Sequence, residues 1–181
     1  MELEQVIRTR RSVRKYLDKP VEREKINACL EAARLAPSAC NSQPWEFIVM
    51  DDPTVKEMFC KEAFSGVYKM SAWAAKAPVL VAAVADKGNF KSRVGNFVRR
   101  TEFYLVDHGI ACEHFILRAW DQGLGTCWIG WLNVDKAGQF FHLPGQKKIE
   151  HLIAVGYPDE TPDPRPRQPF EKMVSYNEYQ K

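Results

Sequence analysis

The sequence predicts one compact globular domain, residues 1–181, that contains both helices and strands. Its 181 residues are 45% hydrophobic and 27% charged, a balance suited to a single buried core. Stretches with helical apolar spacing alternate with short continuous apolar runs, of which residues 79–84 are typical of a strand buried on both faces. Prolines at 158, 162, 164, 166 and 169 indicate that residues 157–181 form an extended arm rather than a packed element.

Apolar spacing, prolines and capping side chains define the expected helices. They cover residues 3–8, 21–35, 53 onward, 64–77, 101–122 and 133–141. Asp52 and Asn133 are expected to cap the helices that follow them. In the helix after Asp52 we expect three side chains to face inward, those of Val55, Met58 and Phe59.

The long helix over 101–122 is apolar on more than one side, so we expect it at the centre of the domain or in a subunit interface. Its polar residues need partners if they are buried. These are Asp107, His108, Glu113 and His114. No carboxylate–histidine spacing typical of a metal site accompanies the histidines, and we predict no metal.

Strands are expected over 46–50, 79–84, 126–130 and 149–155. Residues 86–100, between the second strand and the long helix, are polar and basic with isolated phenylalanines. They are interpreted either as a lid over a site or, more simply, as a solvated connector.

Charge and cysteine usage limit the class of protein. A formal net charge of +3 is too small to indicate binding to nucleic acid or to a membrane. The five cysteines are scattered without C-x-x-C pairs, which favours reduced thiols in the cytoplasm over a disulfide framework or a zinc site. No signal peptide is visible, and no apolar run approaches the roughly 20 residues that span a bilayer.

The first candidate site is the basic stretch that runs from Arg10 to Tyr16. If it is extended, Arg10, Ser12 and Arg14 point to one side, and Arg11, Val13 and Lys15 to the other. Two guanidinium groups that flank a hydroxyl match the oxygens of a phosphate group. The simpler alternative is a solvated basic strand paired with nearby acids. Arg165 and Arg167, held by the prolines of the tail, form a second pair of cations.

The second candidate site is the loop from Pro37 to Trp45, made of small polar residues between two prolines. Asn41 and Gln43 offer carboxamides that match an imide or pyrimidine edge. An ordinary helix-to-strand connector, with Trp45 as a core anchor, explains the same residues equally well. The glycines around the strand at 126–130 allow a flat ring to approach the backbone, although a plain turn is again the simpler reading.

Four motifs together resemble the nitroreductase family of FMN flavoproteins. They are Arg-Arg-Ser-Val-Arg at 10–14, Ala-Pro-Ser-Ala-Cys-Asn-Ser-Gln-Pro-Trp at 36–45, Gly-Leu-Gly-Thr-Cys-Trp-Ile-Gly at 123–130 and Arg-Pro-Arg-Gln-Pro at 165–169. Their order and separation match along essentially the whole chain. The chain has no G-x-G-x-x-G, P-loop or G-x-S-x-G motif, which argues against Rossmann, NTPase and α/β-hydrolase folds.

The resemblance implies an α+β fold with a central mixed, mostly antiparallel sheet flanked by helices. It also implies a homodimer with FMN at the interface and a C-terminal arm exchanged between subunits. By position, Arg10, Arg11, Ser12 and Arg14, together with Arg165 and Arg167, resemble the phosphate-side residues. The ring-side residues would be Pro37, Ser38, Ala39, Asn41 and Gln43, and the strand passing the ring would be Thr126, Cys127, Trp128, Ile129 and Gly130.

We therefore expect an FMN-dependent oxidoreductase that passes hydride from NAD(P)H to a nitroaromatic, a quinone or a similar small acceptor in a ping-pong order. The flavin carries the chemistry, so no catalytic acid or base is named. The alternative is a flavin-binding protein of the same fold that acts as a sensor, a store, a dehalogenase or a flavin-modifying enzyme. A third alternative is a protein that binds nucleic acid through residues 10–15. The sequence argues against it, because no aromatic residues that could stack on bases lie between these cations.

Overall fold

The computed structural model describes residues 1–86 and 101–179. Apart from Asp86, the expected lid or connector at 86–100 lies outside the described residues. The elements are α1 (Leu3–Thr9), α2 (Arg23–Arg34), the 3₁₀ helix η1 (Ala39–Asn41), β1 (Trp45–Met50), α3 (Pro53–Ala63), the 3₁₀ helix η2 (Gly66–Lys76), β2 (Val79–Asp86), α5 (Phe103–Asp121), β3 (Gly125–Ile129), α6 (Val134–Phe140), β4 (Lys147–Gly156) and α7 (Phe170–Met173).

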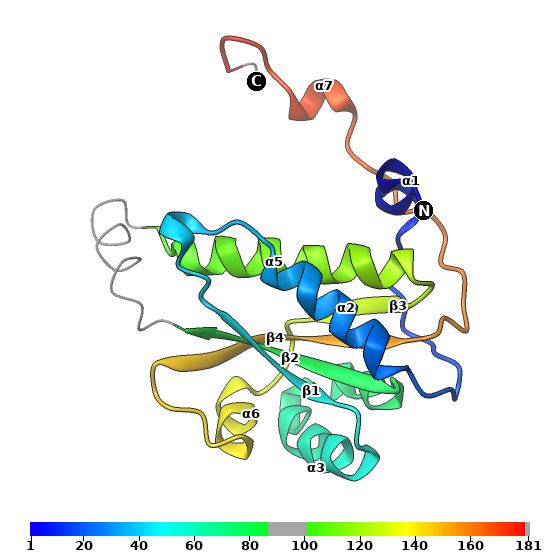
Figure 1. Ribbon diagram of the computed structural model, residues 1–181, viewed down its shortest axis with the longest axis vertical. Helices are drawn as coiled ribbons and strands as arrows, with labels where there is room; N and C mark the ends of the chain where they lie inside the picture. Colours follow the sequence, from blue (N-terminus) through cyan, green and yellow to red (C-terminus); the bar gives the residue numbers. More distant parts are fainter. Residues whose placement is uncertain (87–100, 180–181) are drawn as a thin grey trace.

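One four-stranded sheet organises the domain, in the order β1-β2-β4-β3 (Figure 1). Every pairing between these strands is antiparallel. The prediction of an α+β fold with a mostly antiparallel sheet is therefore confirmed. Within the described ranges, parallel pairing is limited to a single bridge between Ser12 and Thr126.

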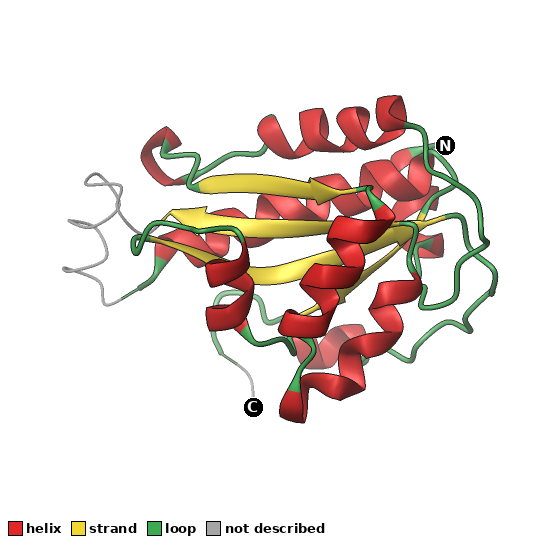
Figure 2. Ribbon diagram, turned by 90° about the horizontal axis from the view of Figure 1, so that it is seen from below, coloured by secondary structure: helices red, strands yellow, loops and turns green. Residues whose placement is uncertain are grey.

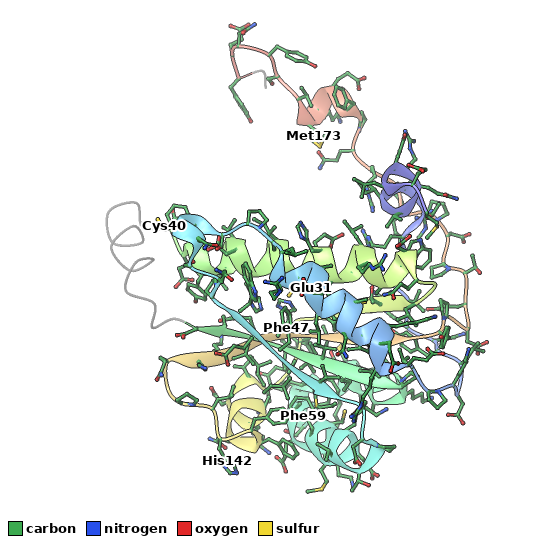
Figure 3. The ribbon with its side chains drawn as sticks, in the orientation of Figure 1. Glu31, Cys40, Phe47, Phe59, His142 and Met173 are labelled. Atoms are coloured by element: carbon green, nitrogen blue, oxygen red, sulfur yellow. The ribbon has the colours of Figure 1, made fainter. Side chains whose placement is uncertain are left out.

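Helices cover both faces of the sheet. α2 and α5 lie over one face, while α3, η2 and α6 lie over the other (Figures 1 and 2). Residues 79–85 of β2 are at most 2% exposed, which confirms the prediction of a strand buried on both faces. Burial of one such aliphatic side chain contributes roughly 1.5–3 kcal/mol. Figure 3 shows Phe47 on the α2–α5 side and Phe59 on the other.

Capping was predicted correctly, and the inward face of α3 was predicted in part. The carboxylate of Asp52 accepts from the amide of Val55, and Asn133 caps α6 in the same way. Phe59 is fully buried, as predicted, but Val55 and Met58 are 40% and 54% exposed, so their expected inward orientation is wrong. Besides Phe59, α3 buries Cys60 and Ala63, because the helix packs against η2 and α6 along a stripe that begins later in its sequence.

α5 has one buried side and one open side. Ala111, Phe115 and Ile116 pack into the core, whereas Leu105 and Val106 are 40% and 53% exposed. The helix therefore covers the sheet with one face and leaves an apolar face without a partner in the described part of the chain. This arrangement agrees with the prediction of a central helix and leaves a surface available to a second subunit.

The tail leaves the domain as an arm. The amide of Leu17 donates to Tyr157, and the amide of Asp159 donates to Lys15, which ties the start of the tail to the basic stretch. Further along, the tail projects from the body and carries the short helix α7, which residues 174–179 follow (Figure 1). Met173, labelled in Figure 3, is 72% exposed. This part of the tail is thus mostly exposed in the single chain.

Candidate functional site

A strongly basic pocket of about 630 Å³ lies between the residues that follow α1 and the proline-rich tail. Six arginines and one aspartate are among its lining residues. The lining comprises Ile7, Arg8, Arg10, Arg11, Ser12, Arg14, Pro162, Asp163, Pro164, Arg165 and Arg167. The structure therefore brings together the two basic clusters, which are far apart in sequence.

Local backbone geometry explains how the first cluster reaches the pocket. The amide of Val13 donates to the carbonyl of Thr126 at 2.9 Å, and Ser12 bridges the same residue of β3. Val13 is fully buried and packs against Gly125, where an added Cβ would lie 2.8 Å from the Val13 side chain. This anchor holds the segment extended and leaves Ser12 and Arg14 facing the pocket.

Arg11 departs from the expected alternation, because it lines the same pocket as Arg10. Its guanidinium donates to the carbonyls of Arg8 and Arg10 at 2.9 and 2.8 Å. Arg10 is the C-cap of α1, so strict alternation begins only after it. The helix end therefore adds one more cation to the pocket than an extended strand would.

The electrostatics of the pocket are unbalanced within the described residues. Arg10 lies 3.6 Å from Glu113, whose pKa is raised by burial despite the nearby guanidinium. No carboxylate of the described chain lies within 4.0 Å of the guanidinium groups of Arg11, Arg14, Arg165 or Arg167. Converging cations repel one another unless an anion is present, so this pocket is suited to a phosphate or a similar dianion.

Glu160 joins the tail to the basic stretch. Its carboxylate accepts from the amides of Arg14 and Lys15 at 2.6 and 3.1 Å. A second pocket of about 460 Å³ adjoins the first and shares Ser12, Arg14 and Arg165 with it. Trp73 lines this second pocket, and the guanidinium carbon of Arg14 lies 5.9 Å from its ring centre. Sequence reasoning missed Glu160 and Trp73, because no local pattern links them to the arginines.

Strand β3 lies next to the pocket, and most of the site residues predicted on it, at 126–130, are buried. Thr126, Cys127 and Ile129 are buried, whereas Trp128 and Gly130 are exposed. Cys127 and Ile129 point away from Trp128, since side chains alternate along a strand. A ligand that passes this strand can therefore reach its backbone and the exposed ring of Trp128. The buried side chains of Thr126, Cys127 and Ile129 are not accessible to it.

The loop at 37–43 is held in an unusual backbone conformation. Cys40, Asn41 and Gln43 have φ values of 53°, 53° and 47°, which L residues seldom adopt. The buried carboxylate of Asp107 accepts from the amide of Ala39 at 3.0 Å and from the hydroxyl of Ser42 at 3.3 Å. α5 thus supplies the partner that fixes this loop.

The hydroxyl of Ser38 accepts from the amide of Gln43 at 3.0 Å, and the two predicted carboxamides contact each other. Gln43 Nε2 donates to Asn41 Oδ1 at 3.1 Å. The side chains of Asn41 and Gln43 are both exposed, as is Pro37. They are therefore available to a ligand or to another chain.

The structure does not bring this loop to the basic pocket within one chain. The loop lies at the beginning of α5, where Figure 3 labels Cys40, and the basic stretch lies at the other end. There the indole of Trp120 donates to Thr9 at 2.9 Å. Asp107 and Trp120 are separated along α5 by about 20 Å at a rise of 1.5 Å per residue.

Among the described residues, none of the helices combines the length and the apolarity that a membrane crossing requires.

Comparison with known proteins assigns the chain to a family. The model of the Nitroreductase family matches residues 7–157. A protein from Methanothermobacter thermautotrophicus that carries the name NADH dehydrogenase/NAD(P)H nitroreductase is 32% identical, over 91% of this chain and 82% of its own. The FMN reductase [NAD(P)H] of Bacillus subtilis is 29% identical, over 93% of this chain and 71% of its own.

A solved structure gives the same result. The crystal structure of a nitroreductase family protein from Clostridium difficile superposes with a TM-score of 0.84 at 26% identity, covering 99% of this chain and 100% of that one. The first three motifs and the antiparallel sheet lie within the matched residues 7–157, and the motif at 165–169 follows them in the tail. The chain belongs to the nitroreductase family.

Proposed function

We propose that this protein is an FMN-dependent oxidoreductase that uses NAD(P)H to reduce a nitroaromatic, a quinone or a similar small acceptor. The observation that carries the proposal is the convergence of guanidinium groups on one pocket, where those of Arg11, Arg14, Arg165 and Arg167 have no carboxylate of the described chain within 4.0 Å. A phosphate dianion is the simplest ligand that balances them. Related proteins named FMN reductase and NADPH-flavin oxidoreductase support FMN as the carrier of that phosphate.

Each basic cluster has a distinct part in this proposal. Arg10, Arg11 and Arg14 approach the phosphate from the strand side, where Ser12 adds a hydroxyl donor. Arg165 and Arg167 approach from the tail, whose prolines limit the conformational freedom lost on binding. Two contacts within the chain hold the sides of the pocket, because Val13 anchors the basic stretch to β3 and Glu160 joins the tail to that stretch.

When bound, FMN would supply the hydride-transfer chemistry between NAD(P)H and the acceptor, in a ping-pong order. The chain's own residues orient the cofactor and exclude water. β3 offers its backbone and Trp128 along the line that leads from the phosphate pocket. Trp73 and Arg14 line the adjoining pocket, where a flat substrate has room to stack.

The ring-side part of the site requires a second copy of the chain in this proposal. The loop with Pro37, Ser38, Ala39, Asn41 and Gln43 lies at the opposite end of α5 from the basic pocket. A homodimer that places this loop over the partner's flavin completes the site. The open apolar face of α5 and the projecting arm supply surface for such a dimer, since exposed apolar patches mark interaction sites.

Flavin binding by arginine variants tests the proposal. Arg10→Ala and Arg167→Ala each remove a charge-assisted hydrogen bond and should weaken FMN binding by roughly 1.5–3 kcal/mol. That loss corresponds to roughly 10-fold to 100-fold in Kd. Arg23→Ala is the matched control. Arg23 lies on α2 and forms an ion pair with Asp51, outside the pocket. Equal affinity in all three variants, or colourless protein that takes up no added FMN, would refute the assignment.

Reduction by nicotinamide separates the enzyme from the alternative of a flavin-binding sensor or store. Anaerobic addition of NADH or NADPH should bleach the flavin spectrum, and a quinone or nitroaromatic should restore it. A bound flavin that neither nicotinamide reduces would favour the non-enzymatic alternative. The same titration identifies the preferred nicotinamide.

A further inference from the structure

Three metal-ligating side chains meet in the core between α5 and the sheet, away from the basic pocket. His108, Cys112 and His151 bring their ligand atoms within 4.8 Å of one another. They are 1%, 0% and 8% exposed. The Nε2 atom of His151 lies 3.2 Å from the sulfur of Cys112, and the two imidazole rings lie 4.9 Å apart between centres.

The fold explains why these three residues converge. His108 and Cys112 are four residues apart on α5, so they point to the same side of the helix on successive turns. His151 shares a face of β4 with Ile153 and Val155, which belong to the core beneath α5. Helix and strand therefore present their ligands to one small volume. The expectation of no metal rested on the spacing of cysteines and histidines along the chain, which does not show that His151 lies beside His108 and Cys112.

Not every polar atom of this cluster has a hydrogen-bond partner. Both ring nitrogens of His108 are buried, and neither makes a hydrogen bond of good geometry to a described residue; the interaction of the ring with the backbone of Ala83 is weaker than that. Buried polar groups without partners are rare and indicate a missing ligand or a special role. Cys112 and His151 have each other, so His108 is the side chain for which a further partner is needed.

The three side chains are chemically suited to a metal ion. Imidazole nitrogen and cysteine sulfur are the ligands that zinc prefers in proteins, and a coordinated cysteine sulfur is deprotonated.

We propose that His108, Cys112 and His151 form a site for one zinc-class ion, with two imidazole ligands and one thiolate. This soft donor set selects zinc over magnesium or calcium. Zn–N and Zn–S bonds of about 2.0–2.3 Å require the ligand atoms to lie about 3.3–3.7 Å apart. The present spread of up to 4.8 Å exceeds this separation by about 1 Å, so the side chains would turn slightly toward the ion, and a water can fill the fourth position.

Binding of one ion would release one proton, from the thiol of Cys112. The zinc–sulfur bond forms as the S–H bond of Cys112 breaks, and the proton leaves to solvent with no change in oxidation state. The ring of Trp128 packs against His151 at 4.1 Å between centres and is 37% exposed, so the site is near the surface on that side. The ion would join α5 to β4 and thereby fix the helix that also holds the 37–43 loop through Asp107.

Cobalt(II) is the spectroscopic probe for this site, and zinc is its competitor. The full-length protein as purified is freed of metal with a chelator and titrated with Co²⁺, with the flavin spectrum subtracted. We expect one Co²⁺ per chain, a thiolate-to-cobalt charge-transfer band, displacement by Zn²⁺, and release of about one proton per metal.

Cys112→Ser should abolish the charge-transfer band, and His108→Gln should weaken Co²⁺ binding at least tenfold while leaving the Cys112–His151 contact in place. Cys29→Ser is the control, since Cys29 is also buried under α5 but lies outside the cluster. Circular dichroism verifies that each variant is folded. If Cys112→Ser does not fold, the His108→Gln result decides. Wild-type protein that binds no cobalt, or that loses the band equally in Cys29→Ser, would overturn the proposal.

Discussion

The contact between Gly125 and Val13 gives a prediction whose magnitude follows from the structure. A Cβ added at Gly125 would lie 2.8 Å from both Cβ and Cγ2 of Val13 and 3.0 Å from Cγ1. Carbon atoms in good contact are about 3.5–4.0 Å apart, so the alanine side chain lacks roughly 0.7 Å of space. Val13 cannot retreat easily, because it is fully buried and its amide is bonded to Thr126.

Overpacking of this kind costs about 1–3 kcal/mol. Replacement of a strand glycine by alanine also stabilises the protein by about 0.5–1 kcal/mol, because alanine lowers the conformational entropy of the unfolded chain. We therefore expect Gly125→Ala to lower the free energy of unfolding by about 1–2 kcal/mol. Gly138→Ala in α6 is the matched control with the opposite sign. No atom lies within 4 Å of its added Cβ, so it should raise stability by about 0.5–1 kcal/mol.

Urea denaturation at a fixed protein concentration measures both changes, since ligand and subunit association shift apparent stability. A double mutant makes the test specific. Val13→Gly removes the three shortest contacts of the added Cβ, so Gly125→Ala should cost about 1 kcal/mol less in that background. If Gly125→Ala is as stable as the parent, or if its cost is the same with Val13→Gly, the packing argument is wrong.

Three further predictions concern other parts of the chain. Asp107→Ala leaves two donors of the 38–43 loop without an acceptor and should cost about 1.5–3 kcal/mol, while faster hydrogen exchange in the loop would show the local effect. Cys40 is exposed whereas the other four cysteines are buried, so one thiol per folded chain should react quickly with a maleimide, and mass spectrometry should locate it at residue 40. The hydrogen bond from Arg23 lowers the pKa of Asp51, so this pair contributes stability above the pKa of the unfolded carboxyl and loses it as the pH falls below about 4. The loss should be small, because Arg23 is largely exposed, and Arg23→Gln should remove this part of the acid sensitivity in pH-dependent unfolding curves.

Local patterns in the sequence were sufficient for much of the fold. The continuous apolar run of β2 predicted its burial on both faces, and Asp52 and Asn133 were recognised as caps from their places before helices. Such features depend on neighbours within a few residues, where spacing along the chain fixes spacing in space. The same reasoning was wrong for Val55 and Met58, because which side of α3 is buried depends on η2 and α6.

The amino-acid sequence by itself determined that two basic clusters exist, that one precedes the domain body and that the other lies in a stiff tail. Only the tertiary structure decided that Arg10 and Arg167 line one pocket, that the 37–43 loop lies at the far end of α5, and that His151 meets His108 and Cys112. The physical reason is that contacts between distant segments are set by how the sheet pairs and how helices pack on it. No local spacing of residues encodes that arrangement.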